Sequence, residues 1–336
     1  MVECWPYPEA EKSESMRTIT LEEHFATPDF LKATTPLVPA GRVNFVQAVE
    51  SKLLDLGQGR IAEMDAAGID VQVLSLTGNG MDMLDGPTAT ALARDANDKL
   101  DAAVRAHPKR FAAFAALALQ NPEKAAAEFE RCVRKLGFKG ALVHGTTKGV
   151  FLDDPQFTPL FEAAQALDVP IYLHPSPPPK PVQEAYFSGL PGQLGFFLAT
   201  AAWGWHVETG THCLRLMASG LFDRFPKLRI IIGHMGEDLP FSIARAEMIL
   251  SRDTKHLKRR VGEYFQEHFY ITTSGYFTVP PFLCTLQVIG ADRILFSVDY
   301  PYSPNAAGRN FLNALPVSPE DLGKISHGNA ERLLKL

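Results

Sequence analysis

The stretch TITLEEHF, residues 18–25, combines β-branched and apolar residues with two glutamates and a histidine. Such a composition favours a β-strand. Side chains alternate between the two faces of a strand, so Glu22 and His24 should point in the same direction. We expect both to face the interior of the fold, with Leu21 and Phe25 facing the surrounding helices and the intervening glutamate turned away.

Seven further short apolar segments follow this strand, and longer helical patterns separate them. The segments are residues 69–76, 111–117, 140–144, 169–174, 228–234, 269–273 and 293–299. Helical patterns cover residues 57–67, 90–106, 122–136 and 157–167. Alternation of this kind is typical of parallel strands joined by crossover helices. We predict an α/β fold, a distorted (β/α)8 TIM barrel, while an open doubly wound sheet is the competing topology.

Two long segments exceed a minimal barrel, residues 26–56 after the first strand and 175–211 after the fifth. The second begins with a proline cluster, which we expect to preclude regular helix or central strand there. Long insertions after barrel strands usually build or cover the active site. Residues 1–15 match no targeting signal and are predicted to be a flexible extension, leaving residues 16–336 as one barrel domain.

The composition excludes several classes of protein. Hydrophobic residues make up 46% of the chain and charged residues 21%, which is ordinary for a globular protein. A net charge of -5 gives no electrostatic footprint for nucleic acid. No apolar stretch is long enough to span a membrane. The four cysteines lie far apart with no paired spacing, so we expect a cytoplasmic protein.

Residues able to bind metal or move a proton stand at the ends of five predicted strands. They are Glu22, His24, His144, His174, His234 and Asp299. Each alone is more often a rim, cap or core residue, but the carboxyl ends of barrel strands converge on one bowl. Two carboxylates and two imidazoles, from Glu22, His24, His174 and Asp299, suit one divalent ion, Zn²⁺ or Mn²⁺, with room for water or substrate.

The predicted sixth strand ends in the sequence GHMGE, residues 233–237. Its glycines allow a sharp turn, and Glu237 is placed to hold one ring nitrogen of His234 and thereby fix its tautomer. We therefore predict that His234 transfers a proton or polarises the substrate.

Several of these motifs together resemble a known family. LEEHFA (21–26), YLHP (172–175), GHMGE (233–237), TTSG (272–275) and ILFSVDYP (294–301) are similar to the ACMSD-like aromatic-acid decarboxylases of the amidohydrolase superfamily. The γ-resorcylate and 2,3-dihydroxybenzoate decarboxylases are the nearest groups, over about residues 17–336. Glu22 replaces the first histidine of the common His-x-His start, and the fourth strand ends in His144 instead of a bridging lysine. Both departures favour this branch over binuclear hydrolases.

The resemblance implies a carboxy-lyase that decarboxylates a hydroxylated aromatic acid without oxidation, its direction in the cell being open. It implies that Glu22, His24, His174 and Asp299 bind the ion, and that Asp299, His234 and Glu237 are catalytic. Substrate contacts would come from Arg245, His144, Phe25 and Tyr302, and the chain would form a homodimer or homotetramer. A metal-dependent hydrolase of an ester, lactone or amide is the alternative. A catalytically silent binding protein is a third reading.

Overall fold

The computed structural model describes residues 16–78 and 80–336, so the predicted extension 1–15 lies outside the described residues. All strand pairs are parallel and form two sheets, ordered β1-β2-β3 and β4-β5-β6-β7-β8-β9. The strands are β1 Ile19–Phe25, β2 Val71–Leu76, β3 Phe111–Ala113, β4 Ala115–Ala116, β5 Ala141–His144, β6 Ile171–His174, β7 Ile230–Ile232, β8 Phe269–Thr272 and β9 Ile294–Leu295. The predicted parallel α/β arrangement is thus confirmed.

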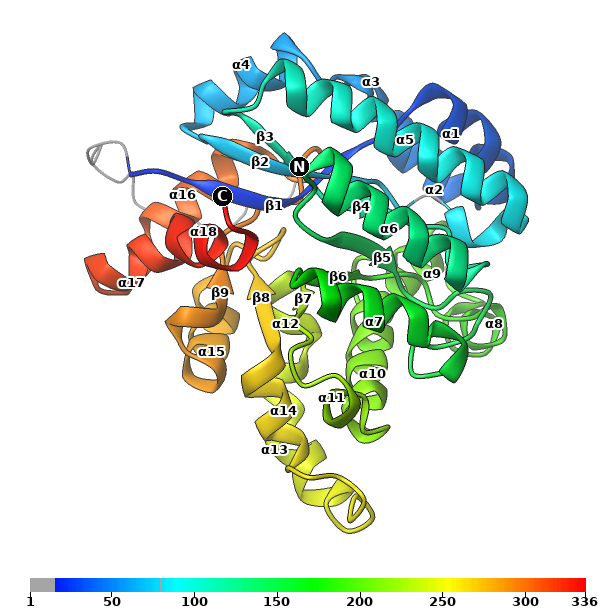
Figure 1. The fold of residues 1–336 in the computed structure, drawn as a ribbon, viewed down its shortest axis with the longest axis vertical. Helices are drawn as coiled ribbons and strands as arrows, with labels where there is room; N and C mark the ends of the chain where they lie inside the picture. The colour runs from blue at the N-terminus through cyan, green and yellow to red at the C-terminus, as the bar shows by residue number, and fades with distance from the viewer. Residues whose placement is uncertain (1–15, 79) are drawn as a thin grey trace.

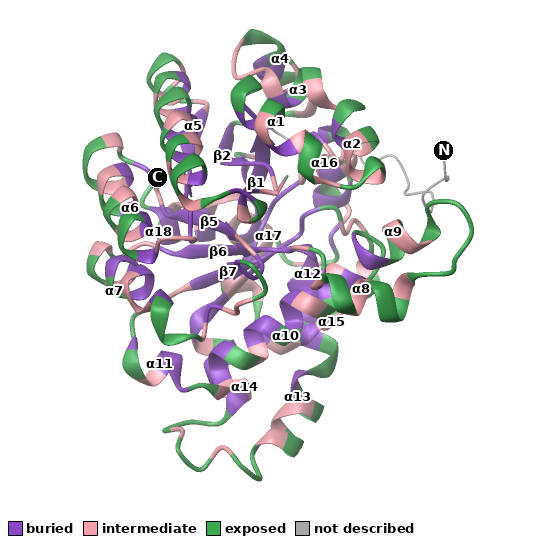
Figure 2. Cartoon of the chain, turned by 90° about the vertical axis from the view of Figure 1, so that its right-hand side faces the viewer, coloured by how far each residue is buried: buried purple, intermediate pink, exposed green. Residues whose placement is uncertain are grey.

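Helices lie around the outside of the strands (Figure 1). They are α1 Pro28–Thr34, α2 Ala40–Gln47, α3 Glu50–Leu54, α4 Gln58–Ala67, α5 Gly86–Ala106, α6 Pro122–Leu136, α7 Thr158–Leu167, α8 Lys180–Phe187, α9 Leu194–Ala199, α10 Gly204–Ala218, α11 Leu221–Arg224, α12 His234–Glu237, α13 Leu239–Leu250, α14 Val261–His268, α15 Val279–Ile289, α16 Asn305–Asn313, α17 Pro319–Gly323 and α18 Asn329–Leu334. Shorter helical turns are η1 Thr35–Leu37, η2 Met81–Met83, η3 Pro155–Phe157, η4 Ala291–Arg293 and η5 Lys324–Gly328. Figure 2 shows the strands buried and the helices exposing their outer faces. No helix among the described residues is long and apolar enough to cross a membrane.

The segment predicted as one strand, residues 111–117, is split into β3 and β4 at Phe114. The first part pairs with β2 and the second with β5. The backbone N–H of Phe114 still donates to Leu74 of β2 at 2.9 Å, while that of Ala115 donates to Gly140 before β5, also at 2.9 Å. This segment therefore passes from one sheet to the other without a break in hydrogen bonding.

The opposite edges, β1 and β9, have no strand ladder between them in the described residues. They are joined instead by one backbone bond, from His24 N–H to the carbonyl of Tyr300 at 2.6 Å, and by the Glu23 carboxylate. That carboxylate accepts from the backbone N–H groups of Val298 at 3.0 Å and Tyr300 at 3.1 Å. We call this contact the β1–β9 seam.

Alternation along the strands divides the core into two clusters. Leu142 and Tyr172 belong to a smaller cluster, to which α18 also contributes and which we call the inner cluster, whereas Val143 and Leu173 belong to the larger cluster between strands and helices. Leu21 lies in the inner cluster, so the prediction that it faces the helices is wrong. The reason is a register shift in β1 between Thr20 and Glu23, an extra residue that makes a β-bulge.

The bulge turns both Leu21 and Glu22 inward, and normal alternation resumes after it. Phe25 faces the helices as predicted. Glu23 points away from the interior, also as predicted, but it is fully buried at the seam.

The two long segments named from the sequence contain helices. Residues 26–56 carry α1, α2 and α3, and residues 175–211 carry α8, α9 and the start of α10. The expectation that prolines preclude helix in the second segment is wrong for α8. Pro181 occupies the first turn of that helix, where its missing N–H would have no partner in any case.

Candidate metal centre and active site

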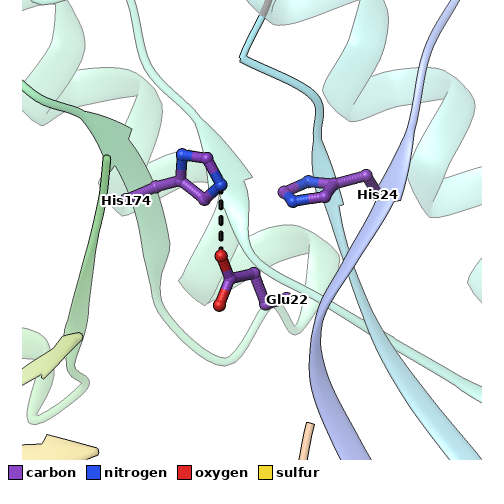
Figure 3. A group of neighbouring side chains, drawn as sticks. All are labelled: Glu22, His24 and His174. Atoms are coloured by element: carbon purple, nitrogen blue, oxygen red, sulfur yellow. Dashed lines mark ion pairs between the residues drawn. The ribbon is translucent and has the colours of Figure 1, made fainter. Parts of the chain in front are cut away.

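Three predicted ligands converge at the strand ends. Glu22 and His24 come from β1 and His174 from the end of β6, and Figure 3 shows their side chains pointing toward one another. Nε2 of His174 lies 3.1 Å from Oε1 of Glu22, and the rings of His24 and His174 are 5.0 Å apart. All three residues are buried. Elements 150 residues apart in the chain thus contribute to one cluster.

Asp299 joins this cluster from the segment after β9. Its Oδ1 lies 3.2 Å from Nε2 of His24, and its Oδ2 lies 3.9 Å from Nε2 of His234. Asp299 and Glu22 both have left-handed backbone, with φ of 70° and 68°. Such a conformation costs about 1–3 kcal/mol in a non-glycine residue and persists where the surrounding structure imposes it. The two carboxylates are therefore held in place by the fold at an energetic cost.

One oxygen of Glu22 is fully engaged and the other is not. Oε2 accepts hydrogen bonds from the hydroxyls of Tyr172 and Ser274, with Thr272 at 3.5 Å. Oε1 is buried without a hydrogen bond among the described residues. Burial by itself raises the pKa of Glu22, but the charge of His234 and the close approach of His174 hold that pKa far below its usual range. Glu22 is therefore an ionised carboxylate with one free oxygen facing the cluster.

Contacts at the Nδ1 atoms orient the imidazole rings of His174 and His24. Nδ1 of His174 lies 2.8 Å from the carbonyl of Pro175, which can only accept, so this nitrogen carries the proton. Nδ1 of His24 lies 3.3 Å from the hydroxyl of Ser75. Both Nε2 atoms are left to face Glu22 and Asp299, and Nε2 of His24 is buried without a hydrogen bond in the part of the chain described. Nε2 of His174 therefore offers a lone pair, and with Nε2 of His24 and the carboxylate oxygens it would suit a divalent cation.

A second group of acidic and imidazole side chains adjoins the first. Oε1 of Glu237 lies 2.7 Å from Nδ1 of His234, and Oε2 lies 2.6 Å from Nδ1 of His206. The first contact agrees with the sequence-based expectation for Glu237. Both carboxylate oxygens are occupied by imidazole N–H groups, so this trio is a hydrogen-bonded unit and offers no free ligand set of the kind seen at Glu22.

The predicted substrate residues fall in different places. His144 pairs in register with His174, with its Nδ1 3.1 Å from the Nδ1 of His174. Tyr302 lies beside the cluster, its ring 5.6 Å from that of His24. Phe25 is fully buried in the outer core, and Arg245 is exposed on α13. The structure brings His144 and Tyr302 to the site, while Phe25 and Arg245 have no described contact with it.

Several residues at the site were not identified from the sequence. Tyr172 stands two residues before His174 on β6, so strand alternation could have indicated it. Arg42 of α2 lies 5.4 Å from the ring centre of Tyr302 and donates to the carbonyl of Gly78. His206 gave no local signal, because it lies in a helix and its partner Glu237 is 31 residues away.

Parallel strands with a carboxylate–imidazole cluster at their carboxyl ends define the class. The chain belongs to the amidohydrolase family, whose model matches residues 47–336. It is 41% identical over 329 residues to the γ-resorcylate decarboxylase of Polaromonas sp. (strain JS666 / ATCC BAA-500), covering 95% of this chain and 98% of the relative.

Two solved structures illustrate the relationship. A dihydroxybenzoic acid decarboxylase from Polaromonas sp. JS666, with bound manganese and the inhibitor 2-nitroresorcinol, has a TM-score of 0.86 and 40% identity, covering 95% of this chain and 97% of that one. The 5-carboxyvanillate decarboxylase LigW from Sphingomonas paucimobilis has a TM-score of 0.89 and 34% identity, covering 96% and 99%. The family resemblance inferred from the sequence is confirmed.

Proposed function

We propose that this chain is a metal-dependent carboxy-lyase that removes CO2 without oxidation from a hydroxylated aromatic carboxylic acid. The observation that carries the proposal is the free Oε1 of Glu22 facing the unpaired Nε2 of His24, with His174 and Asp299 beside them. The relatives that share the whole chain length are decarboxylases of such acids.

Glu22, His24, His174 and Asp299 would hold one divalent ion, Zn²⁺ or Mn²⁺. Two carboxylates with two imidazoles suit either ion, and manganese is bound in a related structure. When bound, the ion supplies positive charge that orients and polarises the carboxylate and the neighbouring phenolic oxygen of the substrate.

The proton for the reaction would pass through Asp299. Decarboxylation places a proton on the ring carbon that bears the carboxylate, and the electron pair of the breaking C–C bond returns to the ring as CO2 leaves. Burial raises the pKa of Asp299, but the neighbouring imidazoles of His234 and His24 outweigh burial and lower that pKa. Asp299 therefore needs a proton donor.

His234 is placed to be that donor. Burial by itself lowers the pKa of His234, but the charges of Glu237 and Glu22 raise it well above the usual value. Its Nε2 lies 3.9 Å from Oδ2 of Asp299, close enough to pass a proton after a small movement. His234 thus serves as the proton reservoir, and Glu237 holds its ring.

A flat substrate would be bound between Tyr302, His144 and the segment after β8. The ring of Tyr302 is fixed by stacking on Phe45 at 5.0 Å and by a 2.6 Å hydrogen bond with Thr77. Gly275 lies directly beside the site, since a Cβ there would stand 3.7 Å from Oδ2 of Asp299 and 4.0 Å from Cδ2 of His234. Phe25 and Arg245 remain predicted substrate residues that no described contact supports.

The decisive experiment measures metal content and CO2 release together. Purified protein loaded with Mn²⁺ is offered 2,6-dihydroxybenzoate, 2,3-dihydroxybenzoate and 5-carboxyvanillate in D2O, beside the variants Asp299→Asn and His174→Ala. We expect about one ion per wild-type chain and deuterium on the ring carbon that lost CO2. The variants should lose activity, and His212→Asn, a buried histidine away from the site, is the matched control.

Two results would contradict the proposal. Absence of CO2 release from a broad panel of hydroxylated aromatic acids would remove the decarboxylase assignment. Incorporation of solvent ¹⁸O into an ester, lactone or amide product would assign the same site to hydrolysis, in which the ligand set activates water instead.

The finer architecture belongs to the same proposal. We infer that residues 16–336 form one (β/α)8 barrel, with the β3–β4 segment linking the two sheets and the β1–β9 seam closing the ring, and with insertions after the first and fifth barrel strands. Cys132, Cys213 and Cys284 are free, which is consistent with a reducing cytoplasm. Exposed apolar side chains, including Tyr186, Phe241 and Trp203, favour a homodimer or homotetramer, which gel filtration would test.

A further inference from the structure

We propose that His206 is a positioning residue for His234, acting through Glu237. This inference rests on the proposed function, because His234 is the residue that supplies the proton there. His206 does not touch the metal cluster in the described residues, and its side chain is only 2% exposed. It is the third residue of α10, a helix that packs against α12, where His234 and Glu237 lie.

The first step is the tautomer of His206. Nε1 of Trp205 lies 3.1 Å from Nε2 of His206, and an indole N–H can only donate. The carbonyl of Ala201 lies 3.0 Å from the same Nε2, so this nitrogen faces both a donor and an acceptor. Nδ1 lies 2.6 Å from Oε2 of Glu237, and an ionised carboxylate can only accept. The carboxylate therefore requires an N–H on Nδ1, and His206 donates to Glu237.

The second step concerns the hydrogen bonds that the carboxylate of Glu237 accepts. Its carboxylate is 0% exposed and receives one imidazole N–H on each oxygen, from His206 and from His234. With both donors present, neither oxygen is left unsatisfied in the protein interior. Without His206, the charge of Glu237 would be compensated by His234 alone, and the carboxylate would be free to rotate.

The third step is the backbone that carries Glu237. His234, Met235, Glu237 and Asp238 all have positive φ, between 48° and 62°. A turn with four strained residues needs contacts that hold it, because each such residue favours another conformation by about 1–3 kcal/mol. The bond from α10 to Glu237 is one such contact, since it ties this turn to a regular helix.

The titratable groups that face His206 come from three elements. Glu237 and His234 lie on α12, Asp238 follows it, and Tyr276 after β8 packs its ring 5.3 Å from that of His206. The carbonyl of Ala201 lies 3.0 Å from Nε2 and would accept a hydrogen bond from a protonated ring. Removing His206 leaves Oε2 of Glu237 without its imidazole donor, so that only the bond with His234 holds the carboxylate.

The test compares His206→Ala, His206→Asn and His212→Ala in the full-length enzyme. Asparagine at 206 retains an N–H donor near the position of Nδ1. His212 lies on the same helix, is equally buried and contacts Leu152, away from the site, so it is the matched control. Each protein is assayed for bound Mn²⁺, for kcat and KM of CO2 release, and for thermal stability.

We expect His206→Ala to lower kcat about 10–100-fold while KM changes less than about threefold and metal content is unchanged, the range typical for loss of a residue that orients a functional group. His206→Asn should recover most of the rate. His212→Ala should lose stability but keep kcat. Unchanged kcat in His206→Ala, or equal losses in the His212→Ala control, would overturn the inference.

A second measurement does not depend on turnover. In Zn²⁺-loaded protein labelled with ¹⁵N-histidine, the Nδ1–H resonances of His206 and His234 should both be strongly deshielded by Glu237. His206→Asn should remove one and shift the other, whereas His212→Asn should shift neither. A His234 resonance that does not respond to His206→Asn would overturn the positioning role. Failure of wild-type CO2 release with these shifts intact would instead overturn the proposed function alone.

Discussion

Glu22 and Glu23 are neighbours on β1, and both side chains are fully buried, yet the protein uses them in opposite ways. Glu22 faces the interior among His24, His174 and His234, where its pKa is held far below the usual range. Glu23 faces the β1–β9 seam. Burial raises the pKa of Glu23 to about 7, although backbone hydrogen bonds from Val298 and Tyr300 oppose that rise.

The difference shows that burial alone does not decide whether the pKa of a carboxylate is raised or lowered, or whether the carboxylate serves as a ligand or as a structural contact. Both residues lose the same contact with water, which by itself disfavours the charged form. Imidazoles offset that cost for Glu22 and leave one oxygen free for a cation. Glu23 accepts from two backbone N–H groups and from the hydroxyl of Ser297, so it joins β1 to the segment after β9, with which β1 shares no ladder.

The contrast between Glu22 and Glu23 is tested most strongly by Glu22→Gln, for which we expect the largest effect. The substitution keeps the shape but removes the charge that the cluster directs at a cation. Loss of a residue that only orients a ligand costs about 10–100-fold in metal affinity or activity, so loss of a ligand itself should cost more than about 100-fold. Elemental analysis and CO2 release would measure this, and retention of the ion with normal activity would contradict the assignment of Glu22.

Removing the metal should destabilise the wild-type protein. An ion that binds only the folded state stabilises it by about 2.7 kcal/mol when its concentration is 100 times Kd. Chelation should therefore lower the free energy of unfolding in urea by about 3 kcal/mol. The same treatment should leave Glu22→Gln unchanged, and an equal effect on both proteins would mean that the ion binds elsewhere.

Glu23→Gln should damage stability while leaving the metal site intact. The amide can no longer present two acceptor oxygens to the seam, so we expect a loss of about 1–3 kcal/mol in the free energy of unfolding. Metal content should not change. Glu184→Gln provides the control, because this exposed glutamate pairs with Lys180 at the surface and should matter by less than about 1 kcal/mol.

The smallest effect is expected from Tyr172→Phe. It removes one hydroxyl donor to Oε2 of Glu22 and leaves Ser274 in place. Metal affinity, measured by competition with a chelator, should fall about 10-fold. Tyr264→Phe is the matched control, since its hydroxyl binds Asp223 away from the site and should leave metal affinity unchanged.

Local signals predicted much of the fold. Helix α6 begins and ends as the sequence indicated, because Asn121 caps its first turn and Gly137 adopts the left-handed conformation that ends it. The residues at strand ends were also predicted to converge, since parallel strands bring their carboxyl ends together. Glu22, His24, His174 and Asp299 lie close together accordingly, although their role as ligands remains a prediction.

Features that depend on contacts between distant segments could not be predicted. The bulge at Leu21 and Glu22 interrupts the alternation predicted from the sequence. Leu21 packs in the inner cluster, and Glu22 lies in the carboxylate–imidazole cluster. His206 reaches Glu237 only because α10 packs on α12.

The sequence by itself determined the alternation of strands and helices, the family, and the residue types available at the strand ends, because periodicity, caps and motifs are local. Only the tertiary structure decided which oxygen of Glu22 is free, which nitrogen of His174 carries a proton, and that Glu23 joins β1 to the segment after β9. These properties depend on which polar groups meet in the buried interior, where each unsatisfied atom is costly and each partner comes from a different segment.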